Sequence, residues 1–372
     1  MSEPAADNPM IVMADDRWEV GSHYSLPDLA PTYARNGDEP SLTDRLGAVA
    51  VGSGRIALGC LLAHGVTRHG WRRLWVPSYF CEDVIGYLAD APVAVTRYAC
   101  GPWGQDETPE GAPGDVLLRV NYFGWGVPSL PCPFAGAVIE DHTHNPLGGL
   151  DSRADFALAS LRKVMPLADG GLYWSPVGYD VPPPPPPSTA HEEAVLHKLA
   201  AMALKRAWLQ GAGNDPVVDK DRLRQMELRG EEELLRGIPA PISDWSRLWL
   251  DRLSSDRMGH VRARNHAALR AALAGAGLRM LGPESPATPA IAVLALPTQR
   301  QRDVLRAGLI ASGIYPAVLW PIPGRADGHP DPAHQFSASV LMLPVDYRYT
   351  GDDMRRVAAT IRNLLDEIST CL

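Results

Sequence analysis

Short hydrophobic runs, each ended by glycine, proline or a polar residue, recur through the first half of the chain. Runs of this length, rich in β-branched residues, are typical of buried strands. They alternate with helix-like segments such as 56–63, where the apolar residues fall on one face. Strand, crossover and strand repeated in this way predict a mostly parallel α/β sheet. The predicted strands cover 48–51, 73–77, 93–96, 116–120, 137–140 and 154–159.

The pattern changes in the second half of the chain. The proline run at 182–187 must be extended and marks an element boundary or a surface loop. Helical spacing follows at 191–209, at 219–236 and, as one long stretch, at 243–274, before a final set of strands (289–296, 338–343) and helices (299–312, 350–368). We therefore predict an N-terminal arm (1–40), a large α/β domain (41–240), and a linking helix with a small α+β domain (241–372).

Composition narrows the class of protein. The net charge of −8 and the mixing of arginines with acidic residues leave no basic patch for nucleic acid. The five cysteines form no C-x-x-C pair, and no signal segment opens the chain, so we expect a reduced, cytoplasmic protein. No apolar stretch approaches the roughly 18 residues that span a bilayer, so we expect no membrane partner.

Lysine is rare in this chain. Four lysines, Lys163, Lys198, Lys205 and Lys220, stand against 31 arginines. A lysine amine can form an imine or lose its proton near neutral pH, whereas an arginine can do neither. Lys163 directly follows the strand-like run 155–160 and is therefore a candidate reactive group. We expect the other three, on predicted helices, to be solvated charges.

A glycine-rich turn, Gly52-Ser53-Gly54-Arg55, joins the first predicted strand to the helix that begins at Ile56. Free backbone N–H groups and the helix dipole would face an anion placed there. The turn also fits the G-x-G-x-x-A dinucleotide pattern, which keeps a nicotinamide-dependent oxidoreductase open, although the next strand ends at Pro77 rather than at an acidic residue. A tight turn without a ligand is the remaining interpretation.

Polar and aromatic residues follow three other predicted strands. Asp141, His142 and His144 come at the end of one strand, where α/β proteins bind ligands. A metal held by the two histidines is an alternative that we do not favour, because no third ligand is near. Asp141 could instead pair with a cofactor nitrogen. The segments 121–124 and 77–81 place aromatic residues at the same edge, where single aromatics are more often core residues.

Five motifs taken together resemble a known family. Ser-Gly-Arg-x-Ala-Leu (53–58), Pro-Ser-Tyr-x-Cys (77–81), Asn-Tyr-Phe-Gly (121–124), Glu-Asp-x-Thr-His (140–144) and Ser-Leu-Arg-Lys…Asp-Gly-Gly (160–171) occur in this order. They resemble the DegT/DnrJ/EryC1/StrS family of pyridoxal phosphate (PLP)-dependent aminotransferases, of the aspartate-aminotransferase fold (fold type I). The resemblance covers nearly the whole chain. It implies a large α/β domain with a mostly parallel seven-stranded sheet and a small C-terminal α+β domain.

The resemblance also implies roles for individual residues. Lys163 would form the internal aldimine with PLP and later move protons, and Asp141 would hold the pyridinium nitrogen protonated. The turn from Ser53, through the backbone of Gly54, Arg55 and Ile56, would bind the cofactor phosphate together with the Ser160 hydroxyl. Finally, His144 and Asn121 would lie near the ring oxygen, and one of Tyr79, Phe80 and Cys81 would cover the cofactor face.

The chain departs from the family pattern at Gly54-Arg55, where Gly-Thr is usual, and at 160–163, where the family has Ser-Phe-His-x-x-Lys. We therefore expect an aminotransferase acting on an amino-sugar or natural-product precursor, with an amino donor and a keto acceptor, in a homodimer. Another PLP reaction, such as dehydration, decarboxylation or racemisation, stays open because the cofactor supplies the electron sink for all of them. The oxidoreductase and a catalytically silent binding protein are more distant alternatives.

Overall fold

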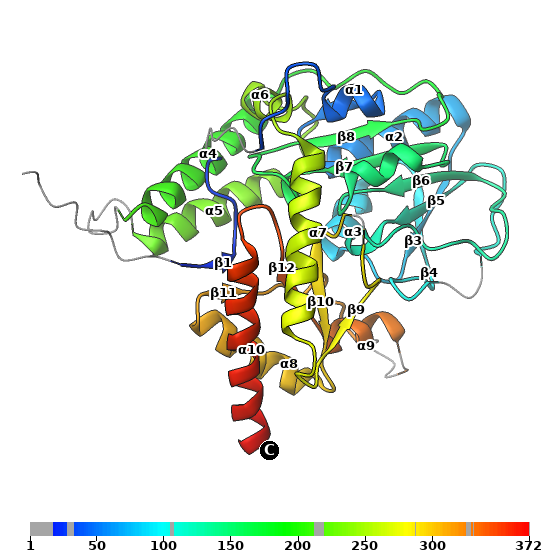
Figure 1. Cartoon of the computed structure of the whole chain (residues 1–372). Helices are drawn as coiled ribbons and strands as arrows, with labels where there is room; N and C mark the ends of the chain where they lie inside the picture. Colours follow the sequence, from blue (N-terminus) through cyan, green and yellow to red (C-terminus); the bar gives the residue numbers. More distant parts are fainter. Residues whose placement is uncertain are drawn as a thin grey trace, which may run out of the picture.

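The computed structural model describes residues 18–27, 33–104, 108–211, 219–286, 288–324, 329 and 331–371. Figure 1 shows the large sheet with helices around it at one end of the molecule and a smaller sheet at the other end. Much of the predicted N-terminal arm, residues 1–17 and 28–32, lies outside the described residues. None of the described helices combines the length and the apolar character that crossing a membrane requires.

A seven-stranded sheet forms the larger part of the fold and confirms the predicted class. Its strands are parallel except β8, which runs antiparallel to both of its neighbours. The spatial order is β2 (Val49–Val51), β8 (Gly171–Trp174), β7 (Phe156–Ser160), β6 (Ala137–Asp141), β5 (Asp115–Val120), β3 (Arg73–Pro77) and β4 (Ala94–Tyr98). The sequence pattern predicted six of these strands and missed β8, a four-residue run directly after the Asp-Gly-Gly motif.

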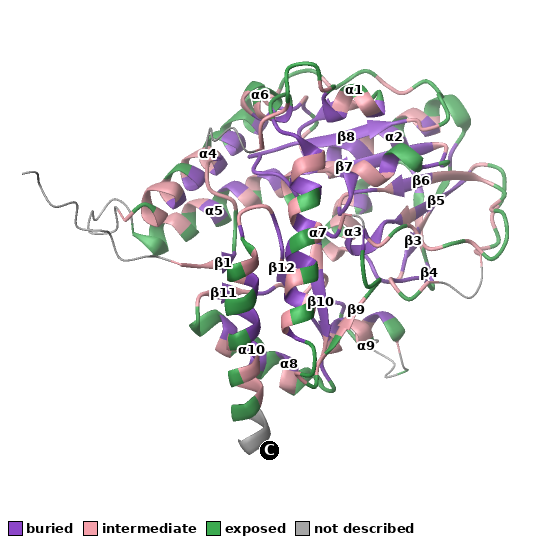
Figure 2. Ribbon diagram, in the orientation of Figure 1, coloured by how far each residue is buried: buried purple, intermediate pink, exposed green. Residues whose placement is uncertain are grey.

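The parallel strands are buried because helices pack against the sheet. Helix α2 (Gly54–His69) packs against β7 and β8, and its residues Leu61 and Leu62 are completely buried. Figure 2 shows the buried residues concentrated along the strands, with exposed residues on the outer helix surfaces and loops. The shorter elements around this sheet are α1 (Leu42–Leu46), α3 (Glu82–Tyr87) and the 3₁₀ turns η2 (Leu88–Asp90), η3 (Tyr122–Gly124), η4 (Pro146–Asp151) and η5 (Leu161–Lys163).

The C-terminal part has its own antiparallel sheet, ordered β12 (Val340–Pro344), β10 (Ile291–Ala295), β9 (Arg279–Leu281). Helices α8 (Gln299–Ala311) and α10 (Gly351–Cys371) enclose a separate hydrophobic core with this sheet. Strand β11 (Ile314–Tyr315) pairs in parallel with β1 (Val20–Gly21), so the N-terminal segment is attached to the C-terminal sheet region. Helix α9 (Pro332–Ser339) precedes β12.

The predicted helix at 243–274 is two helices, α6 (Asp244–Leu250) and α7 (Ser255–Ala272). The break occurs because Ser254 caps α7: its hydroxyl accepts a hydrogen bond from the backbone N–H of Arg257. The side chain of Ser243 caps α6 in the same way. Helix α7 then runs alongside α10 toward the smaller sheet (Figure 1).

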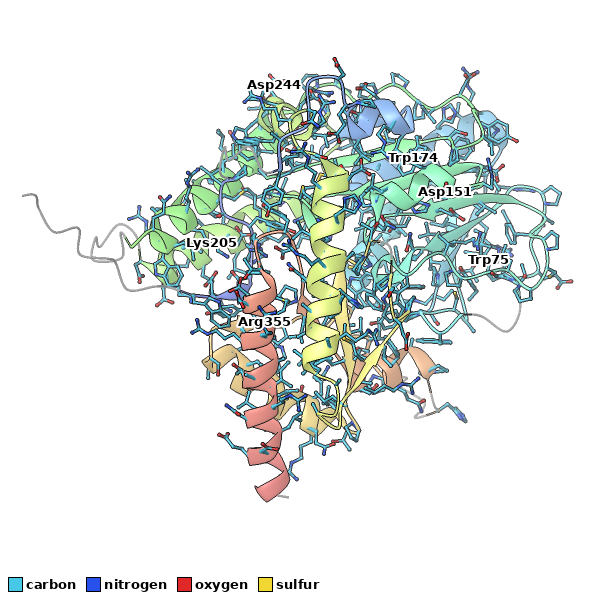
Figure 3. The ribbon with its side chains drawn as sticks, viewed as in Figure 1. Trp75, Asp151, Trp174, Lys205, Asp244 and Arg355 are labelled. Atoms are coloured by element: carbon cyan, nitrogen blue, oxygen red, sulfur yellow. The ribbon has the colours of Figure 1, made fainter. Side chains whose placement is uncertain are left out.

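Helices α4 (Thr189–Leu209) and α5 (Lys220–Leu235) form an antiparallel pair beside the N-terminal segment (Figure 1). The expectation of solvated lysines on these helices is wrong for two of them. Lys198 and Lys205 (Figure 3) are 5% and 3% exposed, and Lys205 Nζ lies 2.8 Å from a carboxylate oxygen of Glu19. Buried amines need such partners. Helical spacing alone could not show this, because the partners lie on other segments.

Candidate active site

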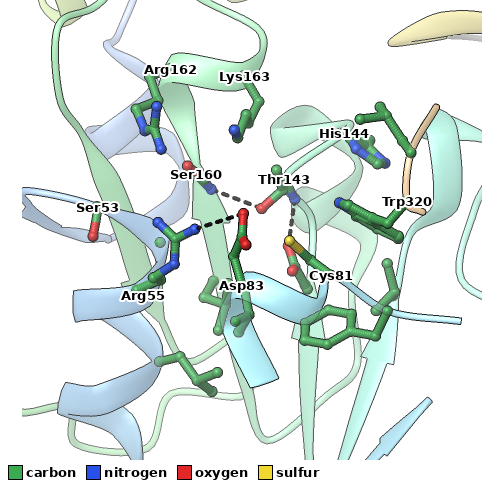
Figure 4. A pocket seen from close by; sticks show the side chains of 18 of the residues that line it. Ser53, Arg55, Cys81, Asp83, Thr143, His144, Ser160, Arg162, Lys163 and Trp320 are labelled. Carbon is green, nitrogen blue, oxygen red and sulfur yellow. Dashed lines mark hydrogen bonds and ion pairs between the residues drawn. The ribbon is translucent and has the colours of Figure 1, made fainter. Parts of the chain in front are cut away.

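A cavity of about 300 Å³ opens at the edge of the large sheet where the parallel strands end. We call it the main cavity. Residues from the ends of β6 and β7 line it together with the start of α2 and segments from the C-terminal half (Figure 4). Its polar lining residues are Ser53, Arg55, Cys81, Asp83, Asp141, Thr143, His144, Ser160, Arg162, Lys163, Glu231 and Trp320.

The glycine-rich turn forms one end of the main cavity. Ser53 is the N-cap of α2, and its hydroxyl accepts a hydrogen bond from the Ile56 N–H at 3.2 Å. The N–H groups of Gly54 and Arg55 belong to the first helical turn, where no carbonyl of the helix can accept from them. A Cβ on Gly171 would lie 2.3 Å from the Ser53 carbonyl, so glycine there lets β8 pack against the turn. The turn therefore offers a helix N-terminus to an anion.

Two guanidinium groups flank this helix N-terminus. Arg55 is 8% exposed, and its Nη2 is 3.9 Å from the nearer oxygen of Asp83, a long contact. Arg162 makes a two-point ion pair with Glu231 on α5, at 2.5 and 2.7 Å. Burial and the charge of Arg162 lower the pKa of Arg55. The buried Nε atoms of both arginines lack a hydrogen-bond acceptor among the described residues. Each guanidinium thus has an N–H donor left for an anionic ligand.

Lys163 lies directly beyond Arg162 in the turn η5, which follows β7. Its side chain borders the main cavity and two neighbouring cavities, and in Figure 4 its amine points into the space between Arg162 and His144. The positive charge of Arg162 and burial lower the pKa of the Lys163 amine to about 8. A larger fraction of the amine is therefore neutral and nucleophilic near pH 7 than for an ordinary lysine.

Asp141, the last residue of β6, supplies the acidic group of the cavity. One carboxylate oxygen accepts a hydrogen bond from the Thr143 N–H at 2.8 Å. Burial raises the pKa of Asp141, and no lysine or arginine among the described residues makes an ion pair with it. Thr143 is held in place because its hydroxyl accepts a hydrogen bond from the Ser160 N–H at 2.9 Å. A partly buried carboxylate without a cation is suited to a positively charged ring nitrogen.

His144 forms the opposite wall of the main cavity. Its ring is stacked between Phe123 and Trp320, with centroids 5.7 and 5.8 Å away. The backbone N–H of Phe123 donates to His144 Nδ1 at 3.0 Å, which leaves the proton of a neutral ring on Nε2. Burial and the nearby Lys163 charge lower the pKa of His144 to about 4. The imidazole is thus neutral near pH 7, with Nε2 as a hydrogen-bond donor.

His142 belongs to a polar network behind the cavity. Its Nε2 is 3.1 Å from Glu140, which also accepts from the Ser152 hydroxyl at 2.6 Å and pairs with Arg119 at 2.9 Å. The amide nitrogen of Asn121 lies 3.3 Å from His142 Nδ1. The two histidines therefore face different surroundings, because both follow the end of β6 at Asp141 and strand geometry no longer places them on one face. Across the part of the chain that the structure describes, no group of three or more His, Cys, Asp or Glu residues could hold a metal ion.

Most of the predicted site residues lie together. The main cavity is lined by Ser53, Gly54, Arg55, Phe80, Cys81, Asp141, His144, Ser160 and Lys163. Three predicted contacts do not line it. The Ile56 N–H is used by Ser53, the Asn121 oxygen accepts from the Gly126 N–H, and the Tyr79 hydroxyl donates to the Leu319 carbonyl. The polar groups of these three residues are thus engaged within the protein.

Sequence reasoning missed five polar lining residues: Asp83, Thr143, Arg162, Glu231 and Trp320. Arg162 and Thr143 stand inside quoted motifs, and their position next to Lys163 and Asp141 was a usable signal. Glu231 and Trp320 have no such signal. They are distant in sequence and reach the cavity only because α5 and the segment before α9 pack against the strand ends.

Comparison with solved structures shows that this chain has the fold of aminotransferases. Spr1654 of Streptococcus pneumoniae, a protein with a provisional assignment as a sugar aminotransferase, matches in its PLP form with a TM-score of 0.59 and 14% identity, over 94% of this chain and 100% of that one. DesI, solved in the presence of its TDP-sugar product, matches with a TM-score of 0.51 and 17% identity, over 92% and 94% of the two chains.

The aminotransferase TlmJ from Streptoalloteichus hindustanus matches with a TM-score of 0.51 and 14% identity, covering 94% of this chain and 100% of that chain. No protein-family model matches the chain, and no curated protein matches it in sequence. At such low identity the likeness defines the fold, and the chemistry must be argued from the site itself.

Proposed function

We propose that this protein is a PLP-dependent aminotransferase of the DegT/DnrJ/EryC1/StrS type, acting on an amino-sugar or natural-product precursor. One observation carries the proposal: the amine of Lys163 and the unpaired carboxylate of Asp141 border one cavity, with a helix N-terminus at its end. An oxidoreductase that used only the glycine-rich turn would need neither residue.

The residues present fit the cofactor. Gly54, Arg55 and Arg162 offer backbone and guanidinium donors to a phosphate, and the buried guanidinium Nε atoms still lack acceptors among the described residues. Asp141 would keep the pyridine nitrogen of the cofactor protonated, and the Nε2 N–H of His144 would donate a hydrogen bond to the cofactor's ring oxygen. When bound, PLP supplies the electron sink that makes the substrate's C–H bond acidic.

Lys163 would have two tasks. Its lowered pKa provides a neutral amine for covalent attachment to the cofactor aldehyde. Once displaced by the amino substrate, the same amine would carry the proton between carbon atoms as a general base and acid, because its pKa lies near the working pH. The aromatic groups of Phe80 and Trp320 and the thiol of Cys81 would exclude water from the cofactor faces. Burial raises the pKa of the Cys81 thiol, which favours its neutral form.

The substrate class is supported by the neighbours in fold. DesI was solved with a TDP-sugar product, and Spr1654 is assigned as a sugar aminotransferase. We propose a keto sugar or related natural-product intermediate as the amino acceptor. We also propose that the chain acts as a cytoplasmic homodimer, with domain boundaries near 41 and 241, which sedimentation and limited proteolysis can test.

The decisive experiment is the visible absorbance of the purified protein after incubation with PLP. We expect a yellow protein that bleaches with borohydride and then carries the mass of reduced PLP on the peptide containing Lys163. Lys163→Arg keeps the positive charge and should show neither the yellow colour nor the added mass on this peptide. A colourless wild-type protein that takes up no PLP would refute the proposal.

A second measurement separates amino transfer from other PLP reactions. Addition of L-glutamate, L-glutamine or L-alanine to the yellow protein should convert it to the pyridoxamine form, with release of the matching 2-oxo acid. Loss of ammonia or carbon dioxide from an amino acid without a pyridoxamine product would instead identify a dehydratase or a decarboxylase.

A further inference from the structure

The Asn-Tyr-Phe-Gly segment after β5 opens a turn with an unusual backbone, residues 121–126, which we call the clamp turn. Phe123 is completely buried and lies in the left-handed region, at φ 55° and ψ 12°, which residues with a side chain rarely adopt. Gly124 and Gly126 follow with φ angles of 80° and 118°. Strained backbone of this kind persists only where its surroundings hold it, and it is concentrated at functional sites.

Hydrogen bonds from two directions hold the clamp turn in this conformation. From within, the side-chain oxygen of Asn121 accepts from the Gly126 N–H at 2.9 Å and closes the turn. From outside, the N–H of Ala290, directly before β10, donates to the Phe123 carbonyl at 2.9 Å. The conformation of Phe123 is therefore set by the turn itself and by the C-terminal half of the chain.

The clamp turn acts on one residue of the main cavity, His144. The Phe123 N–H donates to His144 Nδ1 at 3.0 Å. A backbone N–H can only donate, so Nδ1 must accept, and a neutral ring then carries its proton on Nε2. The rings of Phe123 and Trp320 stack on the imidazole with interplanar angles of 15° and 18°. A ring flip that exchanged the two nitrogens would have to displace both aromatic groups.

The position of this proton matters for any ligand in the main cavity. A free neutral imidazole exchanges between two tautomers, one with the proton on each nitrogen. With the proton on Nε2, His144 donates to an oxygen atom of a ligand. With the proton on Nδ1, Nε2 becomes an acceptor and repels the same oxygen. The tautomer therefore decides whether His144 attracts or repels such an atom.

We infer that the clamp turn fixes His144 in the Nε2–H tautomer, with Phe123 and Asn121 as positioning residues. Phe123 supplies the N–H donor and one face of the stack, and Asn121 closes the turn. The tautomer is a property of the protein without a cofactor. Only its use, donation to the ring oxygen of PLP, rests on the proposed function.

The ¹⁵N resonances of the histidine rings in the cofactor-free full chain test the inference directly. Correlations between ring protons and ring nitrogens distinguish the two tautomers, and the signal lost in His144→Gln identifies His144 among the 11 histidines. Burial lowers the pKa of His144 to about 4, so we expect a single Nε2–H tautomer that does not change between about pH 6 and 8. A mixture of tautomers, the Nδ1–H form or a protonated ring in this range would overturn the inference.

Gly124→Ala should displace the clamp turn while the Phe123 N–H and the imidazole remain present. The added Cβ would lie 2.3 Å from the carbonyl oxygen of Thr288, and alanine disfavours a φ of 80°. We expect the tautomer ratio of His144 to shift toward Nδ1–H by about fivefold or more, the effect of one lost hydrogen bond. Gly86→Ala is the matched control, since its Cβ meets nothing within 4 Å.

Asn121→Ala opens the same turn without a steric clash, because it removes the acceptor for the Gly126 N–H. It should shift the ratio in the same direction. Asn121→Asp keeps an accepting oxygen and should restore the wild-type ratio. Since the Asn121 amide also lies 3.3 Å from His142 Nδ1, the result must agree with that of Gly124→Ala, which leaves this contact in place.

Thermal unfolding shows whether each variant is folded, and the wild-type spectrum decides even if the variants unfold. A pure Nε2–H tautomer in folded Gly124→Ala and Asn121→Ala would refute the positioning role. PLP uptake is measured separately. A single Nε2–H tautomer without PLP uptake would leave the clamp turn standing and refute the aminotransferase. PLP uptake by a wild-type protein with mixed tautomers would do the reverse.

Discussion

Arg162 and Glu231 form a partly buried two-point ion pair immediately beside Lys163, between a turn after β7 and helix α5. Both residues line the main cavity with the lysine. Burial raises the pKa of Glu231, but the charge of Arg162 outweighs this effect and holds that pKa well below its usual range. Arg162 lowers the pKa of Lys163 and Glu231 raises it, so the pair sets the balance of charge around the amine.

The pH dependence of Lys163 chemistry follows from this balance. A lowered lysine pKa means that the neutral amine appears as pH rises through about 8, well below the ordinary lysine range. We expect the rate of PLP attachment, trapped with borohydride and measured by mass, to rise from pH 6 and level off above about pH 9. A rate that keeps rising up to pH 10.5 would contradict the environment described for Lys163.

Arg162→Gln and Glu231→Gln should move that profile in opposite directions. Without Arg162 the lysine loses the cation that repels its charge, so its pKa rises, whereas without Glu231 it loses an attracting carboxylate, so its pKa falls. The measurement is the midpoint of PLP attachment against pH. Glu233→Gln, on the same helix but paired with His197, should leave the midpoint unchanged. Shifts of the same sign in both variants would refute the arrangement.

Asp141→Asn should weaken PLP binding, because an amide cannot compensate the positive charge of a ring nitrogen. We expect affinity to fall by roughly 10- to 100-fold, the effect of one charge-assisted hydrogen bond. Titration followed by absorbance measures the change, and thermal unfolding checks the fold. Asp151→Asn, at an exposed position in η4, is the control. Unaltered affinity in Asp141→Asn would remove this residue from the site.

Gly171→Ala should disrupt the turn that carries the helix N-terminus. The added Cβ would meet backbone atoms of Ser53 at 2.3 Å, and backbone cannot move aside as a flexible side chain can. We expect a lower melting temperature and weaker binding of inorganic phosphate or PLP. Gly86→Ala adds a Cβ that meets nothing within 4 Å and should be neutral or slightly stabilising, because alanine favours helices. Normal phosphate binding in a folded Gly171→Ala would contradict the packing.

Several features could be predicted from the sequence because they depend on near neighbours. The alternation of apolar runs and helical spacing predicted six strands of the large sheet and a helix from Ile56, two residues after the observed start of α2 at Gly54. Strand β8 was missed because four residues after a glycine pair carry too little pattern. The break at Ser254 was missed because a cap inside a long helical pattern is a weak local signal.

The candidate site likewise contains residues that the sequence predicted and residues that it did not. Lys163, Asp141, Ser160 and the turn at Ser53 were predicted because they follow strands, and parallel strands bring their carboxyl ends to one edge. The scarcity of lysine, by contrast, was a poor guide, since Lys198 and Lys205 are buried in ion pairs and neither of them lines the main cavity.

The sequence by itself determined the order of strands along the chain, the fold class and the positions of Lys163 and Asp141. Only the tertiary structure decided that Glu231 pairs with Arg162, that Trp320 stacks on His144, and that the buried Arg262 donates to the carbonyl of Val164. The physical reason is distance along the chain. Local propensity acts over a few residues, whereas burial and ion pairing depend on segments that meet only when the two sheets and their helices pack together.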